Sequence, residues 1–270
     1  MKLPINLSFL KPIKYNNLIR LGNDSDGGYI LPGNLLKSID GIISFGLNDD
    51  WTFEEAALNH INKKIDVHIY DHSVGLKTFL RMLFNNIFSL YGFVSLIFGG
   101  QKFKNTYNLI VTIFKYKIFF KKNVIHYQNR VYNRKDLDID IEIEDIFKRQ
   151  SNNKNILLKI DIEGGEYRIL NQIINYQKLI PIITCEFHDI GPLRKTFEDN
   201  LKSILEFYYI LHLHGNNYVG CSEDNTPDVL EITFINKNQI DYNVIYLNQV
   251  NNKDLDFPNN LNKPDYILEF

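Results

Sequence analysis

Short runs of apolar residues recur along the chain, and many of these residues are β-branched or aromatic. Near-continuous apolar runs of this length are typical of strands that are covered on both faces of a sheet. The pattern predicts strands over residues 41–45, 67–70, 124–127, 156–160, 182–187, 208–212 and 229–234.

Helical patterns lie between most of these runs, over residues 52–61, 166–179 and 195–207. In the first of them Thr52 is expected to be the N-cap residue. Strands that alternate with helices indicate right-handed βαβ units and a mostly parallel sheet. The last two strands have no obvious helix between them and are predicted to pair antiparallel. The expected fold is α/β, a single Rossmann-like, doubly wound domain over residues 1–270.

Residues 76–123 interrupt this alternation, because they are too many for a simple crossover. The segment is predicted to be an inserted helical cap, since helical spacing relates its apolar residues Leu76, Phe79, Leu80, Leu83, Ile87 and Leu90. No Asp or Glu occurs between His72 and Lys135, whereas Lys and Arg recur. The segment could cover the active site, form a homodimer interface or touch an anionic membrane surface. Packing as a cap or dimer interface is preferred over membrane contact.

The composition narrows the classes of function. The chain has 270 residues, is 44% hydrophobic and carries a formal net charge of −2. General nucleic-acid binders are usually clearly basic, so no nucleic-acid partner is expected. The cysteines, Cys185 and Cys221, form no CxxC pair, which argues against a thiolate zinc site and a disulfide-stapled secreted fold. Neither a signal peptide nor a spanning stretch is evident, so a cytoplasmic protein is expected.

Ligands of open α/β sheets bind beyond the carboxyl ends of the strands, so the residues that follow each strand are candidates for a site. After the first strand, Gly46 lets the backbone approach a ligand closely, but Asp49 and Asp50 would repel a pyrophosphate. A cofactor with a cationic centre and an amino-acid tail fits this loop better. After the second strand, Asp71 is placed to accept both hydroxyls of an adenosine ribose, with helix capping as the alternative. Asn129, after the third strand, could contact adenine.

Two carboxylates, Asp161 and Glu163, follow the fourth strand and precede Gly164 and Gly165. The glycines permit a tight turn and an open floor for a substrate. A carboxylate at this floor can accept a proton from an attacking hydroxyl or hold a divalent ion. The alternative is that an acid caps the next helix, a role expected of Glu166 rather than of Asp161.

Histidines lie near the ends of the fifth and sixth strands. Glu186 and His188 alternate along one strand and therefore point to one face, and His212 and His214 do so on the next. Imidazole is suited to accept a hydroxyl proton near neutral pH. A functional site is therefore preferred over purely structural histidines.

Several segments, taken in order, resemble the FkbM-type class I methyltransferases that depend on S-adenosylmethionine (SAM). They are SFGLNDDWTFEE, IYDHS, LLKIDIEGGEYRIL, TCEFHDI, LHLHGNN and PDVLEITFI, and the upstream LGNDSDGGYILP resembles an element of a subgroup. The resemblance implies a seven-stranded sheet, SAM as methyl donor and a hydroxyl as acceptor. It also implies that Phe45, Gly46 and Asn48 touch the methionine part of SAM, that Asp71 holds the ribose, and that Asp161 lies beside the methyl group.

The expected function is a SAM-dependent O-methyltransferase acting on a sugar hydroxyl, with a nucleotide-linked sugar for surface polysaccharide as one candidate. His188 or His214 is expected to be the base. Asp161 and Glu186 would orient the hydroxyl or, with His188, hold a Mg²⁺-like ion; the metal-free version is preferred. The expected cofactor contacts are Phe45, Gly46, Asn48, Asp71, His72, Asn129 and Asp161. The alternatives are a non-catalytic SAM-binding partner protein and a Rossmann oxidoreductase, whose glycine-rich diphosphate turn the chain lacks.

Overall fold

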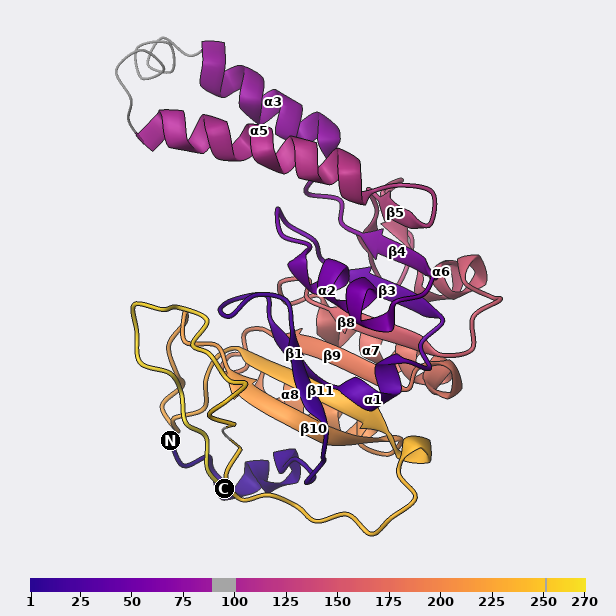
Figure 1. Cartoon of the computed structure of the whole chain (residues 1–270). Coiled ribbons are helices and arrows are strands. Elements are labelled where there is room, and N and C mark those ends of the chain that lie inside the picture. Colours follow the sequence, from indigo (N-terminus) through magenta and orange to yellow (C-terminus); the bar gives the residue numbers. More distant parts are fainter. Residues whose placement is uncertain (89–100, 251) are drawn as a thin grey trace.

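The computed structural model describes residues 1–88, 101–250 and 252–270, and its centre is a seven-stranded sheet (Figure 1). The strands are β3 (Gly41–Phe45), β4 (Asp66–Tyr70), β5 (Val124–Tyr127), β8 (Ile156–Ile160), β9 (Ile182–Phe187), β10 (Tyr208–Gly215) and β11 (Leu230–Asn236). Their spatial order is β10-β11-β9-β8-β3-β4-β5. The strands from β9 to β5 run parallel, whereas β11 is antiparallel to both β9 and β10. The predicted α/β class, with its mostly parallel sheet and final antiparallel pair, is confirmed.

Helices cover both faces of this sheet, and each layer encloses its own apolar core. One layer contains α1 (Gly33–Leu36) and α2 (Thr52–Ile61), and the other contains α6 (Ile143–Arg149), α7 (Glu166–Ile173) and α8 (Arg194–Ile204). Successive side chains of a strand point to opposite faces. In β3, Ile42 accordingly packs in the core with α1 and α2, and Ile43 in the core with α6, α7 and α8.

The predicted helices exist: α2 has the predicted bounds, whereas α7 and α8 end earlier than the predicted residues 179 and 207. The N-cap residue of α2 is Trp51 and not Thr52, because the Asp50 carboxylate accepts a hydrogen bond from the Thr52 backbone N–H (2.9 Å). The helix expected over residues 166–179 stops being α-helical after Ile173 and continues as a 3-10 helix, η2 (Ile174–Leu179). Two further 3-10 helices are η1 (Ile5–Leu10) and η3 (Lys237–Gln239).

Two short strand pairs were not predicted. An antiparallel hairpin of β1 (Leu18–Leu21) and β2 (Tyr29–Pro32) packs against the face that carries α2, and its turn is the segment 22–28. The second pair is β6 (Arg130–Val131) with β7 (Asp140–Ile141), which run parallel. Both pairs border the region in which the site lies.

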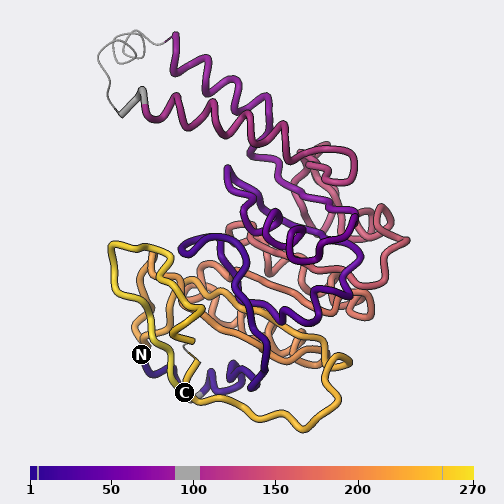
Figure 2. Tube along the Cα trace, in the orientation of Figure 1, coloured from indigo at the N-terminus to yellow at the C-terminus, as the bar shows by residue number. Residues whose placement is uncertain are grey.

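The insertion is a helical hairpin that projects from the sheet beside β4 and β5 (Figures 1 and 2). It consists of α3 (Leu76–Phe88) and α5 (Gln101–Phe119), which pack on each other, and we call these two helices the helical arm. Residues 89–100, Leu90 among them, lie outside the described residues. In the described parts of the chain, no helix combines the length and apolarity needed to cross a membrane.

The base of the helical arm packs on Trp51, the single tryptophan of the chain. The indole stacks on Phe119, with ring centroids 6.2 Å apart, and meets Tyr116 edge-on at 5.9 Å. Trp51 directly follows the loop after β3, so this aromatic contact joins the arm to the edge of the site.

Candidate functional site

A cavity of about 740 Å³ lies beyond the carboxyl ends of the central parallel strands. The strands end in register, because Phe45 pairs with both Tyr70 and Ile160, and Ile160 pairs with Cys185. The turns that follow them therefore meet around one space, at the edge where open α/β sheets bind ligands. The volume is in the range of small-molecule pockets, roughly 300–1,000 Å³.

The floor of the cavity is formed where the turn after β3 meets the turn after β8. Gly46 has a φ of +85°, and a Cβ at this position would lie only 1.7 Å from the carbonyl oxygen of Asp161. The Asp161 backbone N–H donates to the Phe45 carbonyl (2.9 Å), and the Gly46 N–H donates to the Tyr70 carbonyl (3.0 Å). Gly46 was expected to let the backbone approach a ligand closely. In the structure it lets the turn after β3 approach the turn after β8.

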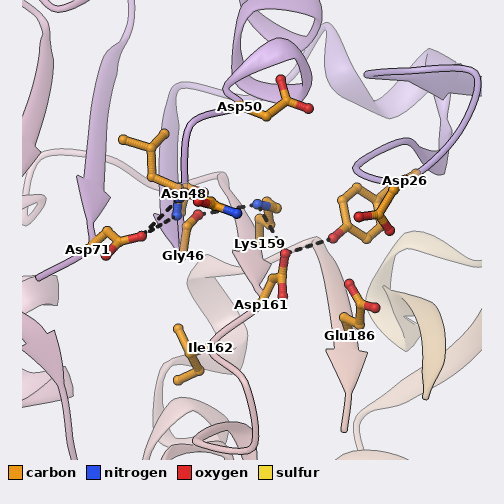
Figure 3. A network of polar contacts seen from close by, with 12 residues as sticks. Asp26, Gly46, Asn48, Asp50, Asp71, Lys159, Asp161, Ile162 and Glu186 are labelled. Carbon is orange, nitrogen blue, oxygen red and sulfur yellow. Dashed lines mark hydrogen bonds and ion pairs between the residues drawn. The ribbon is translucent and has the colours of Figure 1, made fainter. Parts of the chain in front are cut away.

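Asp71 braces the loop after β3 from the wall of the cavity (Figure 3). Its Oδ2 accepts hydrogen bonds from the backbone N–H groups of Leu47 (2.9 Å) and Asn48 (3.0 Å). Its Oδ1 accepts from the backbone N–H and the hydroxyl of Ser73 (2.7 and 2.6 Å). Burial raises the pKa of this carboxyl, but these hydrogen bonds outweigh burial and lower the pKa below its usual value.

A buried cation, Lys159, lies behind the floor. Its ammonium group donates to the Gly46 carbonyl (3.2 Å) and lies 3.7 Å from an oxygen of Asp161 and 3.9 Å from one of Glu54 (Figure 3). Burial alone would lower the pKa of Lys159, but the negative charges of Glu54 and Asp161 outweigh it and raise the pKa. Lys159 is therefore charged at neutral pH and holds the Asp161 carboxylate and the loop together.

Asp161, Glu186 and His188 lie together on the opposite wall of the cavity. Their ligand atoms are all within 4.8 Å of one another, so the three could hold a divalent cation. A second such group, formed by Asp26, Glu186 and Glu231, shares Glu186. Burial, and then the carboxylates of Asp161 and Glu231, raise the pKa of Glu186 well above its usual range.

His188 is oriented by Glu166, a fully buried carboxylate. Glu166 Oε1 lies 3.1 Å from His188 Nδ1 and also accepts the backbone N–H groups of Ile162 and Gly164. The other ring nitrogen, Nε2, is 3.5 Å from Glu163 and 3.9 Å from Glu186. Burial would lower the pKa of His188, but the bond to Glu166 and the charge of Glu186 outweigh it and raise the pKa to about 9.

His214 belongs to a row of ionisable residues that crosses the antiparallel strands. The register pairs His214 with Glu231 and Glu231 with Glu186. The ring nitrogens of His214 lie 3.3 Å from Glu231 and 3.0 Å from Asp265. Burial opposes protonation, but these two carboxylates outweigh it and raise the pKa of His214 to about 10.

The structure thus brings most of the predicted site residues together. Those that line the cavity are Gly46, Asn48, Asp71, His72, Asn129, Asp161, Glu186 and His188. Two predicted site residues do not line the cavity. Phe45 is fully buried and packs edge-on against Tyr70. Both ring nitrogens of His214 are paired with carboxylates, those of Glu231 and Asp265. Glu166 braces the turn before α7 instead of capping the helix.

Sequence reasoning missed the contribution of the β1–β2 hairpin. Its turn places Asp26 on the cavity wall, and Tyr29 of β2 donates a hydrogen bond to Asp161 (3.4 Å). Asn23 of the same turn donates to Asp50 (2.6 Å), which lines the cavity too. The only sequence signal for this hairpin is the segment LGNDSDGGYILP, and its resemblance to an element of a subgroup predicts no role for these residues. Lys159 and Glu166 lie within the LLKIDIEGGEYRIL segment, so the sequence did contain a signal for these two residues.

A comparison with known protein families finds a match for part of the chain. Residues 108–218 match the family described as Methyltransferase FkbM domain. This part of the chain, which is less than half of it, carries an FkbM-type methyltransferase domain. The match spans the turn after β8 and the end of β9, so this part of the methyltransferase supplies Asp161, Glu186 and His188.

Solved structures resemble the methyltransferase only weakly. The fibrillarin pre-rRNA processing protein of Methanococcus jannaschii shares 10% identity at a TM-score of 0.37, over 86% of this chain and 74% of that one. A methyltransferase homolog protein from Pyrococcus horikoshii shares 10% identity at a TM-score of 0.29, over 77% and 68%. No curated protein matches the chain.

Replacement of Gly46 by alanine is expected to destabilise the methyltransferase. The new Cβ would clash with the Asp161 carbonyl, and its φ costs a non-glycine residue about 1–2 kcal/mol before the clash is counted. We expect the free energy of unfolding in urea to fall by more than about 2 kcal/mol. Gly220→Ala is the matched control, because a Cβ there meets nothing within 4 Å. Equal effects of the two substitutions would contradict the proposed contact.

The protonated state of His214 is expected to stabilise the fold. Its pKa is raised in the folded state, so its contribution is complete below about 6.5 and is lost as the pH rises through about 10. The free energy of unfolding should therefore decrease over that interval. In His214→Asn it should be lower by about 3–5 kcal/mol near pH 7, because two carboxylates lose their partner, and its decrease with pH should be shallower. Parallel pH profiles for the two proteins would exclude this role.

Proposed function

We propose that the methyltransferase uses SAM to methylate a hydroxyl group of a sugar. One observation carries the proposal: a single cavity has Asp71 on one wall and the Asp161–Glu186–His188 group on another, with the Gly46 loop between them. This is the separation of tasks that the reaction needs, because one part must hold the donor and another must handle the acceptor's proton.

The charges around the cavity suit a cationic cofactor. Four cationic side chains, Arg130, Lys159, Arg168 and the mostly protonated His188, face six carboxylates, which are Asp26, Asp50, Asp71, Asp161, Glu163 and Glu186. A surplus of carboxylates favours the sulfonium and ammonium groups of SAM and disfavours the diphosphate of a nicotinamide cofactor. SAM supplies a methyl group that its positive sulfur already activates.

Asp71 and the Gly46 loop would hold this cofactor. All four hydrogen bonds to Asp71 come from the protein, so binding a ribose requires it to release one. The hydroxyl of Ser73 is the simplest to displace, because it belongs to an exposed side chain. His72 and Asn129, which line the same wall, would then face the adenosine part.

His188 is the proposed proton acceptor. Glu166 fixes its Nδ1, which leaves Nε2 on the side of Glu186 and the cavity. With a pKa of about 9, the imidazole is mostly protonated at neutral pH in the free protein. A positive charge in the cavity favours the neutral ring, so His188 would release its proton more readily with the cofactor in place. The acidic residues Asp161 and Glu186 would orient the hydroxyl by hydrogen bonds.

An aromatic and guanidinium cluster at the edge of the cavity suits a nucleotide-linked sugar. The Tyr132 ring lies 4.4 Å from the Arg130 guanidinium carbon and 5.0 Å from that of Arg168. All three residues line the cavity. Arg130 already donates two hydrogen bonds to Asp140 (2.7 and 3.0 Å), which leaves the Arg168 guanidinium to meet phosphate oxygens, and an aromatic ring can stack on a base. This cluster supports a nucleotide-linked sugar as the acceptor.

Ligand binding provides the first test. We expect S-adenosylhomocysteine and SAM to raise the melting temperature, with a stabilisation of about 2.7 kcal/mol at a concentration one hundred times the dissociation constant. NAD should have no effect. Asp71→Ala should weaken binding of S-adenosylhomocysteine at least tenfold, whereas Ser73→Ala should bind as well as the unchanged protein. Stabilisation by NAD alone would replace the proposal with a Rossmann oxidoreductase.

Methyl transfer provides the second test. With labelled SAM and a set of UDP-, GDP- and dTDP-linked hexoses, His188→Asn should lower kcat about 10²–10⁴-fold while binding of S-adenosylhomocysteine is retained. The value of kcat/KM should rise with pH up to about 9 in the unchanged enzyme, because the base must be neutral, and should lose this dependence in the variant. His60→Asn is the control, because His60 is in the last turn of α2 and is not among the residues that line the cavity.

Two further outcomes bear on this mechanism. Transfer that survives EDTA treatment would support the metal-free version, whereas loss of activity that Mg²⁺ restores would assign Asp161, Glu186 and His188 to a metal site. Binding of S-adenosylhomocysteine with no transfer to any of these acceptors would favour a non-catalytic SAM-binding protein or another class of acceptor.

A further inference from the structure

The helical arm exposes apolar side chains along both of its helices. They are Leu80, Met82, Phe84 and Phe88 on α3 and Tyr107, Ile110, Phe114 and Ile118 on α5, with exposed fractions between 45% and 70%. None of the described side chains of either helix lines the main cavity. The exposed residues are therefore explained neither by the core nor by the proposed active site.

These residues, apart from Met82, form stripes and are not scattered. On α5, Tyr107, Ile110, Phe114 and Ile118 follow one another at intervals of three or four residues and share one face. The opposite side of α5, with Leu109, Ile113 and Tyr116, packs toward α3 and the body. On α3, Leu80, Phe84 and Phe88 are spaced four apart, and the rings of Phe84 and Phe88 lie 4.3 Å apart.

The arm is also strongly basic. Residues 76–123 contain eight Lys or Arg and no Asp or Glu, so the rest of the chain holds 22 Lys or Arg against 32 Asp or Glu. Among the residues whose side chains the structure describes, seven of these cations are exposed: Lys77, Arg81, Lys104, Lys115 and Lys117 on the arm, and Lys121 and Lys122 directly after α5. Lys115 directly follows Phe114 and Lys117 directly precedes Ile118, so positive charge and apolar surface are adjacent on α5.

This combination points to one kind of partner. Positive charge and aromatic rings would suit a single-stranded nucleic acid, whose bases stack on such rings, but it would leave the aliphatic side chains of Leu80, Ile110 and Ile118 exposed to water. Pairing of two arms would bring two groups of eight positive charges together without any carboxylate between them. The surface of an anionic bilayer satisfies both features, because its headgroups attract Lys and Arg while the region below them accepts aromatic and aliphatic side chains.

We propose that the helical arm docks on a bilayer containing anionic lipids. The exposed apolar residues of α3 and α5 enter the interface, and the flanking lysines and Arg81 pair with lipid headgroups. The arm projects from the edge of the sheet, so the body can remain in water while the arm lies on the membrane (Figure 1). This inference concerns a surface outside the main cavity and does not depend on the reaction proposed above.

Vesicle flotation with the full chain tests the proposal. We expect the partition coefficient to be at least about tenfold higher on phosphatidylcholine vesicles that contain phosphatidylglycerol than on phosphatidylcholine alone, and to decrease as salt is added. The variant Phe84→Ser/Phe114→Ser and the variant Lys115→Glu/Lys117→Glu should each lower it at least about tenfold.

Matched variants outside the arm separate the loss of vesicle binding by the arm from the effect of changing apolar or charged surface residues elsewhere. Ile245→Ser/Leu261→Ser removes apolar residues of similar exposure, and Lys64→Glu/Lys178→Glu reverses two exposed charges outside the arm. Both should bind vesicles like the unchanged protein. All four variants should keep its melting temperature, which shows that the body remains folded.

Three results would overturn the proposal. The first is a partition coefficient that does not distinguish neutral from anionic vesicles, or that the arm variants and the body variants lower equally. The second is a dimer that the Phe84/Phe114 variant converts to a monomer with no loss of vesicle binding, which would make the arm an interface between two copies. The third is binding of single-stranded RNA, but not of vesicles, that depends on Lys115 and Lys117 alone.

Discussion

The backbone of Gly46 lies against the carbonyl of Asp161, and this contact sets the floor of the cavity. It requires a residue without a Cβ, because any side chain would overlap the neighbouring turn. The loop that leaves β3 is then held from three sides, by the Tyr70 carbonyl, the Asp71 carboxylate and the Lys159 ammonium group. The positions of Asn48, Asp71 and Asp161 relative to one another all depend on this arrangement.

The second constraint on the site is the balance of charge behind its walls. Several carboxylates converge at the carboxyl ends of β8 and β9 and at the amino end of β11, and such groups repel one another when buried. Lys159, which lines the cavity, and His214, which lies outside it, supply positive charge on either side of them. His188, between Glu166 and Glu186, supplies a third. The open space is therefore left with surplus negative charge, which a cationic ligand would offset.

The sequence was sufficient to predict the sheet and the edge at which the site lies. The central strands are buried on both faces, so their apolar runs stand out, and the carboxyl ends of parallel strands must share an edge. Glu186 and His188 could be placed by alternation alone. Phe45 could not, because alternation does not say which face of β3 turns toward the core with α6, α7 and α8, and the structure puts this ring there.

Contacts that depend on distant segments were beyond such reasoning. One of the two partners of His214 is Asp265, which lies in a segment without regular structure, and no local pattern pairs the two. The strands β1 and β2 have four residues each, too few for a periodic signal, so the arrival of Asp26 and Tyr29 at the site had no sequence counterpart beyond their motif. Phe84 and Phe114 resemble core residues in sequence, and only their exposure distinguishes them.

The position of Trp51 has a practical consequence. The indole is the only one in the chain and is almost fully buried, with the loop of Asn48 and Asp50 on one side and the aromatic rings of α5 on the other. Indole fluorescence responds to the polarity and packing around the ring, so the natural protein contains a single optical reporter at the junction of arm and body. Its emission can be followed without any label while ligands or vesicles are added, and it separates local rearrangement at this junction from loss of the fold as a whole.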